Sequence, residues 1–264
     1  MSFRTMNQNE RRIYLIEQLL QENPSLVNRQ IPESADDQKM LLRALMNVRP
    51  PGAACMEFLE IQDAYLQEEL AAKGITGLDE LRMAEPGIYM WRGDITTLRC
   101  GAIVNAANSG MTGCYHPCHN CIDNCIHTYA GVQLRLKCAE IMERQGYEEP
   151  IGQAKITPAY NLPCDYVIHT VGPIVQGKLT GSHIKQLETC YRSCLCKADE
   201  NHVSSIAFCC ISTGVFMFPG EKAAETAIRA VRQYKAETGS ETEVIFNVFT
   251  EQDERIYRKL LAAD

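Results

Sequence analysis

The sequence lacks the long apolar run that a membrane-spanning helix needs. No apolar stretch among its 264 residues approaches the roughly 20 residues that cross a bilayer. The first twenty residues, MSFRTMNQNERRIYLIEQLL, place Glu17 and Gln18 within an amphipathic pattern, where a signal peptide would be uninterruptedly apolar. We therefore expect no membrane association and a cytoplasmic or otherwise reducing compartment.

An excess of positive charge is also lacking. The chain has 26 Lys and Arg against 33 Asp and Glu, a net charge of −7, which excludes a general basic surface for nucleic acid. Apolar residues make up 45% and charged residues 22%, as in an ordinary folded protein. An anionic ligand would have to be held locally, by backbone N–H groups of loops and helix N-termini.

Cysteine, by contrast, is abundant. An odd count of thirteen, without a secretory signal, favours buried thiols and metal ligands over a disulfide framework. Four of these cysteines lie with three histidines in residues 113–127, GCYHPCHNCIDNCIH. This stretch is either a metal site or a helix with a buried cysteine face.

Pro117 divides the stretch. In one continuous helix the cysteines would form a single buried stripe, at positions 114, 118, 121 and 125. Pro117 opposes such a helix because it lacks an N–H and crowds the preceding turn. A helix starting just after it would place His119 about 200° around from Cys121, too far to share an ion. A metal site therefore requires a loop through about Cys121 and a helix beginning near Asp123, itself a good N-cap residue.

The chain divides into two regions of different periodicity. Up to about residue 82 the apolar spacing is helical, with segments separated by Pro24, Pro32 and Pro50-Pro51. Beyond about residue 87, strands alternate with helices; the strands are expected at 87–93, 102–108, 153–160, 165–172, 204–212 and 243–249, and the helices at 130–146, 182–200, 219–237 and 251–263. The sequence predicts a helical extension, 1–82, and an α/β domain, 83–264, with a largely parallel sheet covered on both faces.

Three segments follow strands at the edge where such sheets bind ligands. In GDIT, the carboxylate of Asp94 either caps the next turn or accepts from a purine amine. In IVNAANSG, Asn105 and Asn108 bond either ribose hydroxyls or loop backbone. In STGVF, the small residues either form an ordinary turn before a helix or let the backbone approach a diphosphate next to the helix N-terminus.

Together GDIT, IVNAAN and ISTGVF resemble the macrodomain family of ADP-ribose-binding modules, over roughly residues 87–264. The resemblance implies a three-layer α/β/α fold with a mixed, largely parallel sheet. It implies that Asp94 holds the adenine amine beside the Ile95 backbone, that Asn108 contacts the distal ribose and that Asn105 braces the loop. The diphosphate and distal ribose would be wrapped by Ser212, Thr213, Gly214, Val215 and Phe216.

One segment departs from the usual family pattern. Hydrolytic macrodomains have a glycine-rich loop and then a V-D-G-A-I-H run; here CIDNCIH aligns Asp123 and His127 with that run, and GCYHPCHN replaces the loop. The replacement resembles zinc-containing macrodomains, which occur beside sirtuin-type ADP-ribosyltransferases in some microbes. Their G-C-x4-H-x-C ligand pattern is matched by Cys114, His119 and Cys121.

The resemblance implies a zinc-dependent hydrolase that removes mono-ADP-ribose from protein side chains, with an Asp or Glu ester as the preferred linkage. Asp123 and Asn108 would be catalytic, and two thiolates with one imidazole leave zinc one open position. Cys118 as a fourth ligand would make the zinc structural, whereas Cys125 and His127 are expected in the core. The alternatives are a non-catalytic ADP-ribose reader with a structural zinc, and an interaction protein that docks through its helices and zinc loop.

Overall fold

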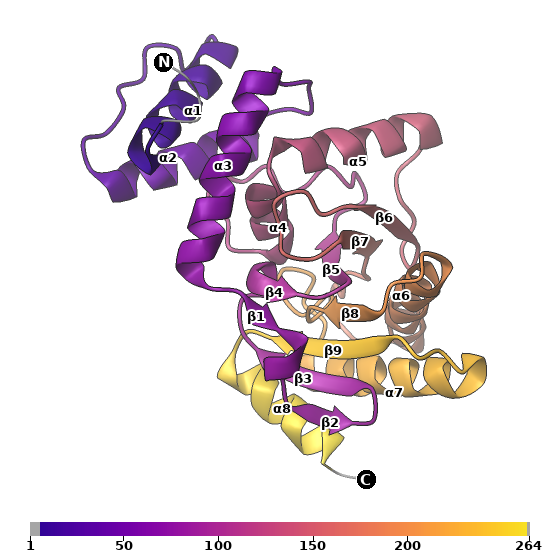
Figure 1. Cartoon of the computed structure of the whole chain (residues 1–264). Helices are drawn as coiled ribbons and strands as arrows, with labels where there is room; N and C mark the ends of the chain where they lie inside the picture. The colour runs from indigo at the N-terminus through magenta and orange to yellow at the C-terminus, as the bar shows by residue number, and fades with distance from the viewer. Residues whose placement is uncertain (1–5, 263–264) are drawn as a thin grey trace.

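A mixed seven-stranded sheet forms the centre of the computed structural model (Figure 1). The structure describes residues 6–262, so the outermost residues of both predicted domains, 1–5 and 263–264, lie outside it. The strand order is β2 (Met83–Glu85), β3 (Ile88–Arg92), β9 (Glu243–Val248), β8 (Ser205–Phe208), β5 (Ala102–Ala107), β7 (Tyr166–Val171) and β6 (Ala154–Pro158). The five strands from β3 to β7 are parallel, and β2 and β6 are antiparallel edges. The predicted mixed, largely parallel sheet is confirmed.

Helices cover both faces of this sheet. On one side lie α6 (Gly181–Glu200), α7 (Gly220–Thr238) and α8 (Glu251–Leu261); on the other lie α4 (Ile122–Ala130) and α5 (Val132–Gln145) (Figure 1). The central strands are therefore buried on both faces, and every residue of β8 is buried. The expected three-layer α/β/α arrangement is confirmed.

Three helices precede the sheet: α1 (Gln8–Glu22), α2 (Ala35–Val48) and α3 (Met56–Lys73). Asn7 and Ser34 cap the first two, and Gly74, with φ of 87°, ends the third. Their apolar faces form a separate small core, which Val132 of α5 joins. Short elements complete the fold: strands β1 (Thr76–Gly77) and β4 (Leu98–Arg99), which pair with each other, and 3-10 turns η2 (Leu78–Glu80) and η3 (Ile95–Thr97). None of the helices in residues 6–262 combines the length and apolarity needed to cross a bilayer.

Polar contacts join this N-terminal extension, α1–α3, to α4 and α5. The buried guanidinium of Arg135 donates from Nη1 to the carbonyls of Met46, Asn47 and Arg49, at 3.2, 2.7 and 2.6 Å. These carbonyl groups lie at the C-terminal end of α2, where no backbone N–H of the helix donates to them. Arg135 therefore provides the hydrogen bonds that the helix itself cannot. Gln62 of α3 accepts from the backbone N–H of Val132 at 2.9 Å. Asn47 of α2 donates to Oγ1 of Thr128 in α4 at 2.8 Å, so the extension is bonded to both helices that follow the predicted cysteine-histidine loop.

Candidate functional site

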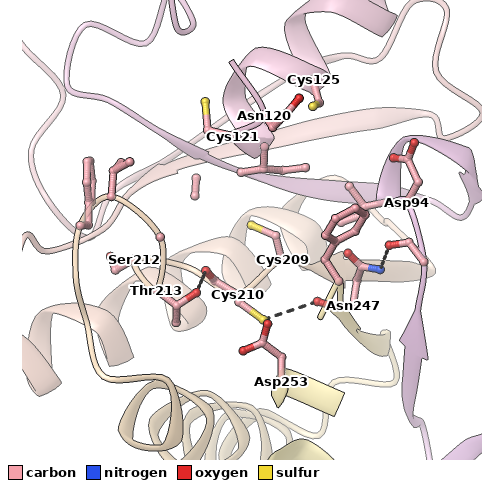
Figure 2. Close-up of a pocket in the computed structure, with 18 of the residues that line it drawn as sticks. Asp94, Asn120, Cys121, Cys125, Cys209, Cys210, Ser212, Thr213, Asn247 and Asp253 are labelled. Atoms are coloured by element: carbon pink, nitrogen blue, oxygen red, sulfur yellow. Dashed lines mark hydrogen bonds between the residues drawn. The ribbon is translucent and has the colours of Figure 1, made fainter. Parts of the chain in front are cut away.

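A cavity of about 570 Å³ opens at the carboxyl ends of the parallel strands (Figure 2). Gly93 and Asp94 follow β3, Cys209 follows β8, and Phe249 follows β9. The side chain of Asn247 ties two of these ends together, because its Nδ2 donates to the carbonyl of Gly93 at 3.0 Å. The cavity therefore lies at the edge where open α/β sheets bind ligands.

Asp94 lines this cavity and also caps η3. Its Oδ1 accepts from the backbone N–H and the hydroxyl of Thr96, at 3.0 and 2.6 Å. Its Oδ2 is 3.6 Å from Nζ of Lys73, and the side chain is 40% exposed. Capping occupies one oxygen only, so that the second oxygen remains available to a ligand.

The Ser-Thr-Gly segment forms the opposite wall. The predicted strand 204–212 is too long: β8 ends at Phe208, and the chain then leaves the sheet as a loop. Within residues 6–262, the backbone N–H groups of Gly214, Val215 and Phe216 donate no hydrogen bond. Consecutive free N–H groups form a concave site that favours an anion. Residues of α7 are not among those described as lining the cavity, so these N–H groups belong to the loop and not to the helix N-terminus.

Behind the cavity wall, two asparagines of the β5 end hold a buried carboxylate. Asn105, which is fully buried, donates from Nδ2 to Oδ1 of Asp123 at 2.8 Å. Asn108 donates to Oδ2 of Asp123 at 3.4 Å and to the carbonyl of Gly113 at 3.1 Å. Burial raises the pKa of Asp123 to about 6, while the Asn105 hydrogen bond and the Arg135 charge oppose this shift. Within the described part of the chain, none of these three side chains lines the cavity itself.

Helix α4 begins at Ile122, close to the predicted start, but its N-cap is Cys121. The Cys121 sulfur accepts from the backbone N–H of Asn124 at 3.4 Å. Asp123 is therefore not the N-cap that its side chain suggested. Its carboxylate instead bonds the two asparagine amides.

Two further predictions for this helix can be checked. Cys125 was expected in the core, and this is wrong, because it is half-buried and lines the cavity. His127 is buried as expected, and its Nε2 lies 3.6 Å from Oδ1 of Asp123. Neither of its ring nitrogens has a hydrogen-bond partner within residues 6–262, and burial lowers the pKa of His127 well below its ordinary value. It is therefore neutral at neutral pH.

The structure brings Cys114, His119 and Cys121 together. Their ligand atoms all lie within 4.8 Å of one another, and Cys114 Sγ is 3.7 Å from His119 Nδ1. As the metal hypothesis requires, residues 113–121 form a loop and not a helix. Two thiols and one imidazole, all half-buried, suit a zinc ion with one position open to a ligand. Cys121 also lines the cavity, so that an ion held here would face the ligand.

Cys118 points away from this trio. Its backbone N–H donates to Oδ1 of Asn47 at 2.9 Å, and its thiol donates to the carbonyl of Met40 at 3.4 Å. Both partners belong to α2. Cys118 thus joins the loop to the N-terminal extension.

A second group of potential ligands is fully buried: His127, Cys138 and His169. Their ligand atoms also lie within 4.8 Å of one another, close enough to hold one ion. His169, however, already has partners on both nitrogens, Asn105 at 3.1 Å and Thr157 at 2.9 Å. The three residues come from α4, α5 and β7, and their sequence spacing carries no metal-site pattern.

Known proteins resemble this chain in sequence and in fold. A Macro domain family model matches residues 104–227. A protein-ADP-ribose hydrolase of Treponema medium is 60% identical over 261 residues, covering 97% of this chain and 100% of that protein. The chain belongs to the macrodomain family. A protein-ADP-ribose hydrolase of Staphylococcus aureus strain MRSA252 is 48% identical over 267 residues, 98% of each chain. The crystal structure of a Trypanosoma brucei macrodomain in complex with ADP-ribose has a TM-score of 0.64 and 28% identity, and the match covers 88% of this chain and 97% of that one.

Sequence reasoning missed several residues of this macrodomain's cavity. Phe249 is 76% exposed at the cavity mouth, directly after β9. The expected strand 243–249 contains Phe249 as its last residue, so the sequence places it at a strand end but gives no sign that it lines the cavity. Arg43 and Tyr129 also line the cavity. Arg43 comes from the N-terminal extension, and no local pattern indicated that it reaches the site.

Proposed function

We propose that this macrodomain is a zinc-dependent hydrolase that releases mono-ADP-ribose from modified protein side chains. Hydrolysis of protein-linked ADP-ribose is supported by relatives with 48% and 60% identity along nearly the whole chain. Zinc dependence is supported by one observation above all: Cys121 belongs to the Cys114–His119–Cys121 trio and also lines the cavity. Zinc in the trio would supply a Lewis acid beside the reacting sugar.

ADP-ribose would lie across the strand ends. Asp94 Oδ2 accepts from the adenine amine, and the exposed ring of Phe249 offers an apolar platform at the same end. The free N–H groups of Gly214, Val215 and Phe216 bind the diphosphate, whose charge they complement without a basic surface. This placement leaves the distal ribose on the side of the cavity formed by Cys121.

Asp123 would act on the attacking water. The water oxygen bonds to C1″, the bond from C1″ to the side-chain oxygen breaks, and the side chain leaves as a carboxylate. Because Asp123 lies behind the cavity wall, it would accept the water's proton through a bridging water. Asn105 and Asn108 orient the carboxylate for this step. We propose an Asp or Glu ester as the substrate, because a carboxylate leaving group needs little protonation.

The wider context is also a proposal. Residues 1–82 and 83–264 are treated as extension and macrodomain, and a sirtuin-type ADP-ribosyltransferase is the proposed source of the modified substrate. A reducing compartment such as the cytoplasm is part of the same proposal, because Cys114 and Cys121 would have to stay reduced to bind zinc.

The test combines metal analysis with turnover on a protein carrying mono-ADP-ribose on glutamate. Wild type is expected to contain about one zinc and to release ADP-ribose. Cys121→Ala should lose zinc and turnover, whereas the matched variant Cys138→Ala should keep zinc, because it removes a thiol from the buried group only. Less than about half an equivalent of zinc in unchelated wild type would contradict the metal assignment. If the zinc-loaded protein binds ADP-ribose but removes none from the modified substrate, it is a reader. If it binds no ADP-ribose, the alternative of an interaction protein is favoured.

The linkage is tested separately on the same wild-type enzyme. Release from the glutamate-linked protein is compared with release from a protein that carries ADP-ribose on serine. Faster release from the glutamate ester is expected. Equal or faster release from serine would overturn the ester preference without affecting the hydrolase assignment.

A further inference from the structure

Arg43 of α2 contacts the loop that carries the zinc ligands, although it lies 76 residues before His119. Its Nη2 donates to the carbonyl of His119 at 2.7 Å and to Oδ1 of Asn124 at 3.1 Å, and lies 3.7 Å from the Cys125 sulfur. The same side chain lines the cavity. One guanidinium from the N-terminal extension therefore joins the loop, the start of α4 and the ligand space.

Asn124 shows why this contact has consequences for the loop. Its Nδ2 donates to the carbonyls of Cys114 and His116, at 3.3 and 3.0 Å, and its backbone N–H donates to Cys121 Sγ. An amide has two donor hydrogens and one acceptor oxygen, and an arginine can only donate. Arg43 thus keeps the Asn124 oxygen towards α2 and the Asn124 nitrogen towards the loop.

The charge of Arg43 also suits this position. Among the described residues that line the cavity it is the only cation, beside the carboxylates of Asp94 and Asp253. The Nε of Arg43 is buried without a hydrogen-bond partner in residues 6–262, so this part of the guanidinium is desolvated at the cavity wall. A lysine would keep the charge, but its ammonium is a compact, strongly hydrated group. It lacks the planar guanidinium whose Nη2 donates to both the His119 carbonyl and Asn124 Oδ1.

We propose that Arg43 is a positioning residue: it fixes the zinc-binding geometry of residues 113–121 and makes the N-terminal extension part of the ADP-ribose site. This proposal rests on the proposed function for its metal and ligand. It assigns to α2 a role that goes beyond packing. Hydrogen bonds that orient metal ligands typically change metal affinity by about 10- to 100-fold when they are removed.

The test compares Arg43→Met and Arg43→Lys with Arg49→Met. Arg49 is the matched control, because it lies at the end of the same helix but its side chain bonds to Glu22 and to Gly52 and Ala53 of the extension. Three quantities are measured: the rate of zinc release to a chelator, the absorption spectrum of the cobalt-substituted protein, and the Kd for ADP-ribose. Circular dichroism establishes that each variant is folded.

Both Arg43 variants are expected to release zinc about 10-fold faster or more, to show an altered cobalt–thiolate spectrum and to bind ADP-ribose more weakly. Arg49→Met should stay within about twofold of wild type even if it unfolds at lower temperature. Wild-type zinc release and cobalt spectrum in a folded Arg43→Met would overturn the proposal. If that variant does not fold, Arg43→Lys decides in the same way. A wild type that holds zinc but lacks hydrolysis would refute the proposed function alone, because the zinc measurements do not depend on turnover.

Discussion

Replacing Arg135 by methionine would test how the N-terminal extension is held on the macrodomain. The guanidinium donates to three carbonyls at the end of α2 and, from Nε, to the carbonyl of Thr112 at 2.8 Å. It is only 5% exposed, and its charge lies 4.2 Å from the centre of the Tyr115 ring. Methionine fills much of the same volume but can donate no hydrogen bond.

The expected loss can be worked out from these contacts. A hydrogen bond to a charged group contributes about 1.5–3 kcal/mol, but the four bonds share one side chain and are not additive. Removing the arginine also releases the cost of burying its charge. We therefore expect the free energy of unfolding to fall by about 3–5 kcal/mol, a large part of the 5–15 kcal/mol that is typical of folded proteins.

The assay is equilibrium unfolding in urea, followed by fluorescence and circular dichroism. Arg144→Ala is the control in the same helix, because Arg144 is exposed and, among residues 6–262, bonds only the carbonyl of Glu140. It should change stability by less than about 0.5 kcal/mol. Arg135→Met should also expose the α2–α4 interface to limited proteolysis before the macrodomain unfolds. A loss below about 1 kcal/mol would refute the inference that this arginine is the main polar link between the two parts.

Two further predictions concern single side chains. Phe249→Ala should leave stability unchanged, because the ring is 76% exposed. It should weaken ADP-ribose binding, measured by calorimetry, by about 1–3 kcal/mol, the typical contribution of a base stacked on an aromatic ring. The control Met217→Ala should leave the Kd unchanged, and an unchanged Kd for Phe249→Ala would contradict the prediction. Burial lowers the pKa of His169 to about 3, so that below pH 6.5 the unfolded chain binds a proton that the folded one does not. Stability is therefore lost as pH falls from 6.5 towards 3, by about 1.4 kcal/mol per pH unit, and His169→Gln should reduce this slope by one proton; identical slopes would show that the histidine is not buried and neutral.

The predictable parts of the fold were those that local chemistry determines. AIVNAAN combines an apolar run with two polar amides, and it becomes β5 and the strand end that follows it. Pro219 immediately precedes α7, as its missing N–H favours. Each feature depends on neighbours within a few residues. The same reasoning failed for the end of β8, because the run from Cys209 to Ile211 remains apolar after the chain has left the sheet.

The contacts of Arg43 and Arg135, by contrast, do not depend on sequence neighbours. Each makes bonds between segments that lie 76–89 residues apart in the sequence. Their partners are mostly backbone carbonyls, which every residue has and no sequence pattern displays. Such contacts require the small core of α1–α3 to be packed against α5, where Val132 joins it. A sequence can therefore predict both parts and still not show that one of them reaches the site of the other.

The start of α4 shows how one incorrect detail changes the chemistry. Pro117 correctly predicted a loop followed by a helix, but the expected N-cap was Asp123 and the observed one is Cys121. Had Asp123 been the cap, its carboxylate would have been bonded to backbone N–H groups. Because the Cys121 sulfur takes that place, the Asp123 carboxylate is left to the amides of Asn105 and Asn108. As the N-cap, Cys121 also lies at the cavity wall. The first turn of α4 therefore positions both the proposed zinc ligand, Cys121, and the proposed base, Asp123.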